Sequence, residues 1–230
     1  MNKTGDTKKA ETAVRTDKYP HSDNDWENFD VLHINRLPSA ATFMAYTTKE
    51  KAVKNDKSQS EYFQSLNGTW KFQFVPRSDQ RPMDFFEKGH DVSGWGNIKV
   101  PANWEMEGYG HPFYVGAGYG IKRNPPLIAV ENSPVGSYKR TFNVPANWKG
   151  KQIVLHFGGV ASAFYVWVNG EKVGYSQDSK TPSEFDITPY AVTGQNEIAV
   201  QVFKFSDGYY LEDQDYWRFA GIQRDVYLYA

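Results

Sequence analysis

Short apolar runs with a period of two dominate this chain from about residue 67 to its end. Trp70, Phe72 and Phe74 alternate with Lys71 and Gln73, which puts three aromatic rings on one face of a strand. Helical periodicity is nearly absent. Further strand-like runs cover residues 152–157, 164–168, 196–205 and 225–229. The pattern therefore predicts a protein built from sheets.

One β-hairpin is specified by its turn. The run from Phe164 to Val168 ends at Asn169-Gly170, a dipeptide whose two residues tolerate the positive φ angles of a type I′ turn. We therefore predict a hairpin over residues 165–175. Many short strands joined by Gly, Pro and Asn turns, with aromatic residues on both sheet faces, favour an all-β fold, a two-sheet sandwich of the jelly-roll type.

The segments around these strands differ in composition. Residues 1–24 are mainly Lys, Thr, Asp and Ser, which cannot offset the entropy of ordering, so a disordered tail is predicted. Residues 25–60 carry scattered apolar side chains, which indicates an extended arm, packed either on its own domain or on another subunit. Residues 61–230 then form the sandwich. Within them, the Pro- and Gly-rich part 101–137 is expected to be a long ordered loop region that carries binding groups.

Charge and cysteine content exclude several classes of function. The chain has 26 basic and 27 acidic residues, so no overall field attracts nucleic acid or an anionic membrane. It has no cysteine, which excludes disulfides, thiolate metal sites and cysteine catalysis. No run reaches the ~18 apolar residues of a membrane span, and the first residues lack the apolar core of a secretory signal. We therefore expect a soluble protein of the cytoplasm or the periplasm.

Acidic, basic and aromatic residues are mixed between the last two strand-like runs. Asp213 and Asp215 would lie on the same side of an extended chain, with Cα atoms about 6.6 Å apart, so they could not act as a pair of carboxyls from opposite faces of a substrate. Together with Glu212 they are expected to form ion pairs and turn hydrogen bonds instead. The partners expected are Arg218 and Arg224.

Asp207 differs from these acids because it follows a strand-like run and precedes Gly208 at the mouth of a loop. A solvent-facing carboxylate there can accept hydrogen bonds from sugar hydroxyls or bind a hard cation. The alternative is a turn in which Asp207 hydrogen-bonds its own backbone. If the carboxylate faces solvent, Asp207→Ala leaves the domain folded, whereas Trp70→Ala removes a core side chain and unfolds it.

The run Ser206–Val226 resembles the end of the N-terminal sugar-binding domain of large bacterial β-galactosidases of glycoside hydrolase family 2. The resemblance covers about residues 25–230, because further motifs follow in the order of that family. They are Asp25-Trp26-Glu27-Asn28, Asn35-Arg36-Leu37, Ser65-Leu66-Asn67-Gly68, Val100-Pro101-Ala102-Asn103-Trp104, Asn124-Pro125-Pro126, Gly174-Tyr175-Ser176-Gln177-Asp178-Ser179 and Pro182-Ser183-Glu184-Phe185-Asp186.

The resemblance implies a galactose-binding-domain-like jelly roll that is the non-catalytic part of a retaining β-galactosidase. Its partners would be an Ig-like domain and a catalytic barrel of the parent, a galactoside substrate and possible further copies in a homo-oligomer. No residue of this chain is assigned catalysis, and the chain alone is expected to be inactive. Asp207 would reach into the barrel's active site and contact substrate hydroxyls and a sodium ion. Magnesium and sodium are thus expected in the parent, and no cofactor in the isolated domain.

A second sugar contact of the family is altered here. Gly116 stands where the sugar-contacting Asn of the family would be, and Gly120 where a Pro would be, which implies a missing hydrogen bond and a looser loop. The specificity of a family 2 β-glucuronidase or β-mannosidase therefore stays open. A further alternative is a stand-alone carbohydrate-binding module, because 16% of the residues are aromatic and exposed rings stack on sugars.

Overall fold

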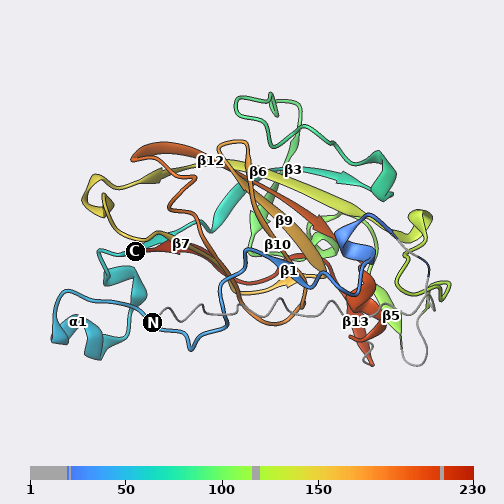
Figure 1. The fold of residues 1–230 in the computed structure, drawn as a ribbon, viewed down its shortest axis with the longest axis horizontal. Coiled ribbons are helices and arrows are strands. Elements are labelled where there is room, and N and C mark those ends of the chain that lie inside the picture. The colour runs from blue at the N-terminus through green and yellow to red at the C-terminus, as the bar shows by residue number, and fades with distance from the viewer. Residues whose placement is uncertain (1–19, 21, 116–119, 213–214) are drawn as a thin grey trace, which may run out of the picture.

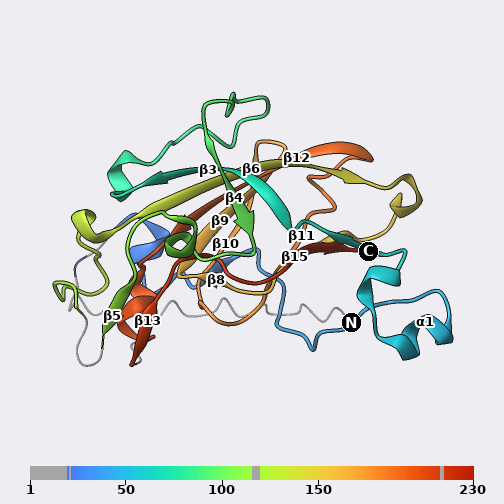
Figure 2. The ribbon, with the colours of Figure 1, turned by 180° about the vertical axis from the view of Figure 1, so that it is seen from behind.

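The computed structural model describes residues 20, 22–115, 120–212 and 215–230. Its described part is a two-layer β-sandwich (Figures 1 and 2). The larger sheet has the strand order β1-β10-β9-β12-β6-β3-β4 and the smaller one β11-β7-β15-β2, with antiparallel pairing throughout. Two short ribbons, β13-β5 and β14-β8, complete the strands. The jelly-roll sandwich predicted from the sequence is confirmed.

The bounds of the elements follow the chain. The strands are β1 (His33–Ile34), β2 (Phe63–Ser65), β3 (Gly68–Val75), β4 (Gly96–Val100), β5 (Phe113–Val115), β6 (Val135–Val144), β7 (Val154–Phe157), β8 (Val160–Ala161), β9 (Ala163–Val168), β10 (Glu171–Ser176), β11 (Ser183–Asp186), β12 (Gly194–Phe203), β13 (Tyr216–Arg218), β14 (Gly221–Ile222) and β15 (Val226–Tyr229). The helix is α1 (Lys49–Lys54), and the 3-10 turns are η1 (Asp25–Glu27), η2 (Lys57–Gln59), η3 (Ser78–Gln80), η4 (Trp104–Glu107), η5 (Val130–Asn132), η6 (Ala146–Trp148) and η7 (Asp207–Tyr210).

The main hydrophobic core lies between the two sheets. Trp70 and Phe72 of β3 are buried in it, and Phe74 packs against it, as the alternation in the sequence predicts. Leu155 of β7 and Leu228 of β15 enter the same core from the smaller sheet. Burial of these large side chains is the main stabilising contribution of the sandwich.

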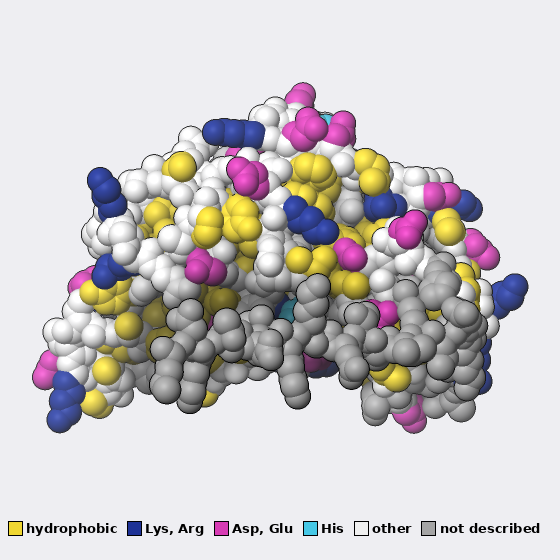
Figure 3. Space-filling model, in the orientation of Figure 1, with side chains coloured by type: hydrophobic (Ala, Val, Ile, Leu, Met, Phe, Trp, Pro, Cys, Tyr) yellow, Lys and Arg dark blue, Asp and Glu magenta, His cyan; other side chains and the backbone are white. Residues whose placement is uncertain are grey.

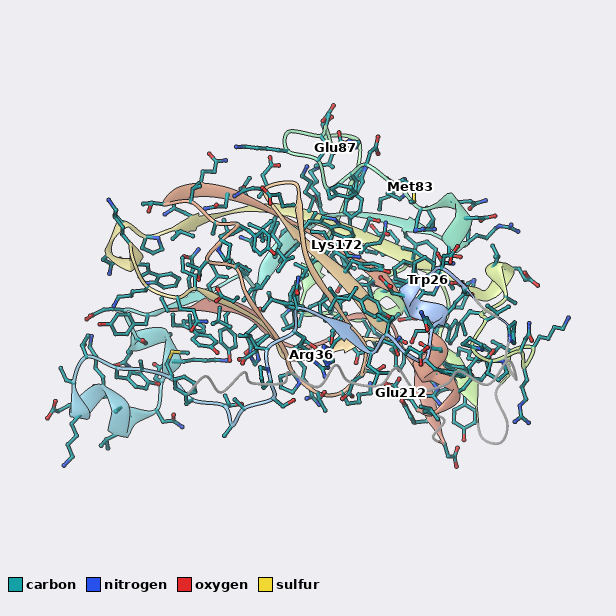
Figure 4. All side chains as sticks on the ribbon, viewed as in Figure 1. Trp26, Arg36, Met83, Glu87, Lys172 and Glu212 are labelled. Carbon is teal, nitrogen blue, oxygen red and sulfur yellow. The ribbon has the colours of Figure 1, made fainter. Side chains whose placement is uncertain are left out.

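A second core covers the outer face of the larger sheet. Tyr165 and Trp167 of β9 point into it, where they meet Phe85 from the segment between β3 and β4. Trp26 of η1 stacks on Phe203 with ring centroids 4.1 Å apart, and Figure 4 labels it at the blue turn η1. Because both faces of β9 are covered, its sequence is apolar without interruption.

The predicted hairpin over residues 165–175 is confirmed. Strands β9 and β10 pair antiparallel, and the connecting Asn169 and Gly170 have φ angles of 52° and 89°. Both angles are positive, as a type I′ turn requires. The side chain of Asn169 also donates to the carbonyl of Tyr190 at 2.9 Å, which fixes the turn to the sandwich.

The arm packs on its own domain. Its β1 extends the larger sheet by pairing with β10, and the backbone NH of Leu37 donates to the carbonyl of Glu184 at 2.8 Å. Helix α1, which the sequence did not predict, interrupts the arm and buries none of its residues. It is stabilised by its ends: the Thr48 side chain accepts from the NH of Lys51, and Asn55 adopts the left-handed conformation.

Other expectations concern the ends and the loops. The predicted tail lies almost wholly outside the described residues, although Ser22 and Asn24 donate to the carboxylate of Glu27, each at 2.9 Å. The region 101–137 carries η4, η5 and β5 before β6 begins. In the described residues, no helix is long and apolar enough to cross a membrane. Acidic and basic side chains are interspersed on the face that Figure 3 shows, in keeping with a net charge of −1.

Candidate functional site

Asp207 opens the turn η7, which follows the long strand β12 after the connecting residues 204–206. The backbone NH of Tyr209 donates to the carbonyl of Ser206 at 2.9 Å, which closes the turn. The rings of Tyr209 and Tyr210 pack in a third apolar cluster with Phe205. Figure 1 shows η7, in red, beside the blue turn η1, so the arm and the segment that follows β12 meet here.

The Asp207 side chain points into the protein. Only 1% of the residue is exposed, so the expected solvent-facing carboxylate is wrong. The carboxylate turns inward because two hydrogen-bond donors lie there. Its Oδ1 accepts from Nε2 of Gln177 at 2.6 Å and from the backbone NH of Gly208 at 3.1 Å. The contact with Gly208 is the local turn bond that was the alternative reading. No hydrogen bond from the described residues reaches Oδ2.

Burial raises the pKa of Asp207 from 3.8 to about 6. The hydrogen bonds from Gln177 and Gly208 act in the opposite direction, because they stabilise the charged form, and the nearby charge of Glu27 adds to the rise. Among the described residues, no lysine or arginine forms an ion pair with this carboxylate. A dehydrated carboxylate held by neutral donors is a strong hydrogen-bond acceptor.

Further buried polar side chains lie next to Asp207 and Gln177. Gln177 donates a second hydrogen bond to the Tyr175 hydroxyl at 2.7 Å. The hydroxyls of Ser162 and Ser206 lie 2.5 Å apart. No role for Gln177 followed from the sequence, although its position shortly after the predicted hairpin and within the motif Gly174–Ser179 was a usable signal.

Two other acids of this segment, Glu212 and Asp215, have carboxylate partners that differ from those predicted. The carboxylate of Glu212 accepts from the backbone NH and the hydroxyl of Ser179, at 2.9 and 2.6 Å, so an arginine partner for it is wrong. Arg218 instead donates to the carbonyl oxygen of Glu212 at 2.5 Å. Figure 4 shows Glu212 at the end of the chain segment that carries η7.

Two more of these predictions concern Asp215 and Arg224. The Asp215 carboxylate accepts a hydrogen bond from the hydroxyl of Tyr114, and Arg224 donates to the carbonyl of Lys180 at 2.9 Å. Asp213 lies outside the described residues. The carboxylates of Glu212 and Asp215 therefore hold their segment to neighbouring parts of the chain.

Two exposed aromatic rings stand on the ribbon formed by β5 and β13. Tyr114 and Trp217 are cross-strand neighbours with ring centroids 5.3 Å apart, and each is 52% exposed. The ribbon ends next to residues 116–119, so the predicted sugar contact at Gly116 lies outside the described residues. Exposed rings of this kind can stack on a sugar or pack against another protein surface.

Asp207 is the candidate ligand for a cation. Hard cations take several oxygen ligands, and carboxylates are the strongest of these in proteins. Among the described residues, however, no three His, Asp or Glu side chains gather in a way that could hold a metal ion. The predicted sodium contact of Asp207 would therefore need its other ligands from outside these residues.

Comparison with known proteins identifies the family. Over residues 63–230, more than half of the chain, the sequence matches the family described as glycosyl hydrolases family 2, sugar binding domain. The chain belongs to glycoside hydrolase family 2. This confirms the resemblance found in its motifs.

The relatives of this family 2 domain are much longer proteins. A β-galactosidase of Priestia megaterium is 45% identical over 234 residues, which cover the whole of this chain and 22% of that protein. A β-galactosidase of Psychromonas ingrahamii is 42% identical over 204 residues, covering 89% of this chain and 19% of that protein. The chain thus spans about a fifth of the length of these curated relatives.

Solved structures show the same fold. β-Glucuronidase 2 of Bacteroides uniformis matches with a TM-score of 0.55 and 26% identity, over 72% of this chain and 17% of that one. A β-glucuronidase of Ruminococcus gnavus matches with a TM-score of 0.55 and 22% identity, over 75% of this chain and 30% of that one.

Proposed function

We propose that this chain is the non-catalytic N-terminal domain of a retaining β-galactosidase, which hydrolyses terminal β-D-galactosides in its full-length form. In this proposal residues 61–230 form the domain proper, buttress a catalytic barrel next to an Ig-like domain, and lend Asp207 to the substrate pocket. The observation that carries the proposal is the 45% identity, over the whole chain, to a protein named β-galactosidase.

The chemistry of Asp207 supports this role. Its Oδ1 accepts two hydrogen bonds inside the chain, so in this proposal Oδ2 is the oxygen that accepts from a sugar hydroxyl once the barrel completes the pocket. Hydrolysis with retention needs two carboxyls about 5 Å apart on opposite faces of the sugar. Asp207 is neither of these two carboxyls, because its proposed role is to accept a hydrogen bond from the sugar. The two catalytic carboxyls would come from the barrel, so the isolated chain is expected to be inactive.

Charge favours a galactoside over a glucuronide. At neutral pH Asp207 is ionised, since its pKa is about 6, and it would repel the carboxylate of a glucuronide bound beside it. The solved structures of similar fold are nevertheless β-glucuronidases, which makes a glucuronide the second candidate substrate.

Activity assays separate the candidate substrates. The full-length protein, or a chimera in which this chain replaces the aligned part of the Priestia megaterium relative, would be assayed on nitrophenyl β-galactoside, β-glucuronide and β-mannoside. We expect the galactoside to have the highest kcat/KM by a wide margin. A preference for the glucuronide or the mannoside would overturn the proposal.

Asp207→Asn tests the role of the carboxylate in the same protein. A hydrogen bond to a charged group contributes about 1.5–3 kcal/mol, so kcat/KM should fall about 10- to 100-fold. Unchanged kinetics would remove Asp207 from the substrate pocket.

A stand-alone carbohydrate-binding module is favoured by one observation, the exposed pair Tyr114 and Trp217. Amide NMR titration of the 230-residue chain with galactose, lactose and plant oligosaccharides distinguishes it. We expect a well-dispersed β-type spectrum without shifts, because one carboxylate and two rings form only part of a pocket. Shifts confined to β5 and β13 would instead support the binding module.

A further inference from the structure

We propose that Gln177 is the positioning residue of Asp207: its amide holds Oδ1 and thereby fixes the orientation of the carboxylate. This inference rests on the proposed role of Asp207 in the substrate pocket. It assigns a function to the motif Gly174–Ser179, which the proposed function alone leaves unexplained.

The amide of Gln177 is fixed by its own hydrogen bonds. Its Nε2 donates to Oδ1 of Asp207 at 2.6 Å and to the hydroxyl of Tyr175 at 2.7 Å, and the carbonyl of Val31 lies at 3.4 Å. Gln177 and Tyr175 are both buried. Rotation of the amide would therefore break two short hydrogen bonds inside the protein, where water cannot replace them.

The backbone of Gln177 is held as firmly as its side chain. Its NH donates to the carbonyl of Leu32 in the arm at 3.1 Å, and its carbonyl accepts from the hydroxyl of Ser176 at 3.0 Å. The residue follows directly on β10, to which the arm strand β1 pairs. The backbone of Gln177 thus lies between the larger sheet and the arm and is hydrogen-bonded there, which fixes the position of its side-chain amide.

Gly208 gives the amide its room. A Cβ at this position would stand 3.1 Å from Oε1 of Gln177 and 3.2 Å from the hydroxyl oxygen of Ser206. Both distances are shorter than an ordinary contact. A glycine after Asp207 therefore lets the turn η7 approach the Gln177 amide closely.

A neutral donor suits this task better than a cation would. A lysine or arginine at position 177 would form an ion pair with Asp207 and compete with the sugar hydroxyls for its charge. The amide orients the carboxylate and leaves its charge unpaired. Glu27 of the arm is also negative, and its charge acts on Asp207. Its carboxylate accepts hydrogen bonds from Ser22, Asn24 and the NH of Ile128.

The test compares Gln177→Met with a matched control, Gln201→Met, in the full-length protein. Gln201 is also buried, and its Nε2 donates to the carbonyl of Pro82 at 3.0 Å and to the hydroxyl of Ser137 at 3.1 Å. We expect Gln177→Met to lower kcat/KM on nitrophenyl β-galactoside by about 10- to 100-fold, mainly through kcat, as loss of an orienting partner does. Gln201→Met should stay near the wild-type value.

A double-mutant cycle separates positioning from stability. In the Asp207→Asn background, Gln177→Met should cause little further loss, because no charge is left to orient. A loss of the same size in both backgrounds would overturn the inference, as would equal losses in Gln177→Met and Gln201→Met. Normal kinetics of Gln177→Met beside an impaired Asp207→Asn refute the inference alone. Normal kinetics of Asp207→Asn refute the proposed function and the inference together.

Two further readouts guard against a variant that fails to fold. Gln177→Glu keeps the shape but sets two carboxylates at hydrogen-bond distance, where they must share a proton, so activity relative to wild type should fall as pH rises. In the 230-residue chain, carboxyl NMR of Gln177→Met should show a pKa of Asp207 above that of the wild type, because the amide stabilises the charged form. An unchanged pKa would mean that the contact does not form.

Discussion

The burial of Asp207 predicts an unusual pH dependence of stability in the 230-residue chain. Its pKa is 3.8 as a free side chain and about 6 in the folded protein. At 1.36 kcal/mol per pKa unit, this rise corresponds to about 3 kcal/mol. Since the folded state binds the proton more tightly, the sign follows: the ionised carboxylate lowers the free energy of unfolding above about pH 6, and this cost disappears below about pH 4.

Asp207→Asn isolates this contribution. An Asn oxygen can still accept from Gln177 and from the NH of Gly208, but it does not titrate. Urea unfolding followed by tryptophan fluorescence would give the free energy of unfolding of both proteins between about pH 4 and pH 7. Comparing the variant with the wild type at each pH removes the contributions of all other groups.

We expect the variant to gain about 3 kcal/mol on the wild type as the pH rises across this range. A difference that is constant with pH would refute the reasoning, since it would mean that Asp207 has an ordinary pKa and is hydrated. Asp207→Ala should change the free energy of unfolding, whereas loss of a solvent-facing carboxylate would leave it nearly unchanged. At about pH 4, where the carboxyl is protonated in the folded state, it removes the acceptor of the Gln177 amide and should cost about 1–3 kcal/mol.

The remaining predictions concern two buried parts of the sandwich. Trp70→Ala should cost about 3–5 kcal/mol, because Trp70 is fully buried and its Nε1 donates to the carbonyl of Leu66; urea unfolding measures the cost, and a much smaller one would contradict the packing of the core. Lys204→Met should cost about 3–5 kcal/mol, because it leaves the carboxylate of Glu105 buried without the ammonium that now lies 2.5 Å away. The double variant Lys204→Met with Glu105→Gln should regain most of that loss, and no recovery would show that the ion pair is not the cause.

The sequence predicted those features of the fold that depend on local pattern. Asn169-Gly170 specified a hairpin because only a few residues tolerate both φ angles of its turn. Alternation in β3 specified which face of that strand enters the core. Helix α1 was missed because its support is local capping by Thr48 and Asn55, without an apolar face to produce a period.

The candidate site was only half predictable. A motif and a position after a strand were enough to single out Asp207, but not to say where its carboxylate points. That direction is decided by Gln177, a donor 30 residues earlier in the chain, and by Gly208, whose lack of a side chain lets η7 approach. Contacts between distant segments leave no periodicity in either segment, so a single sequence does not reveal them.

Strand β9 belongs to two cores, and this limits how its sequence can change. Phe164, Val166 and Val168 face the smaller sheet, whereas Tyr165 and Trp167 face the arm and the segment before β4. No position on the strand is open to solvent, so every substitution has to be matched by its neighbours. Those neighbours differ: a paired sheet moves as a unit, but an arm and a loop can shift locally. We therefore expect the tolerance to substitution to alternate along β9. Tyr165 and Trp167, which face the arm and the loop, should accept more residue types than Phe164, Val166 and Val168.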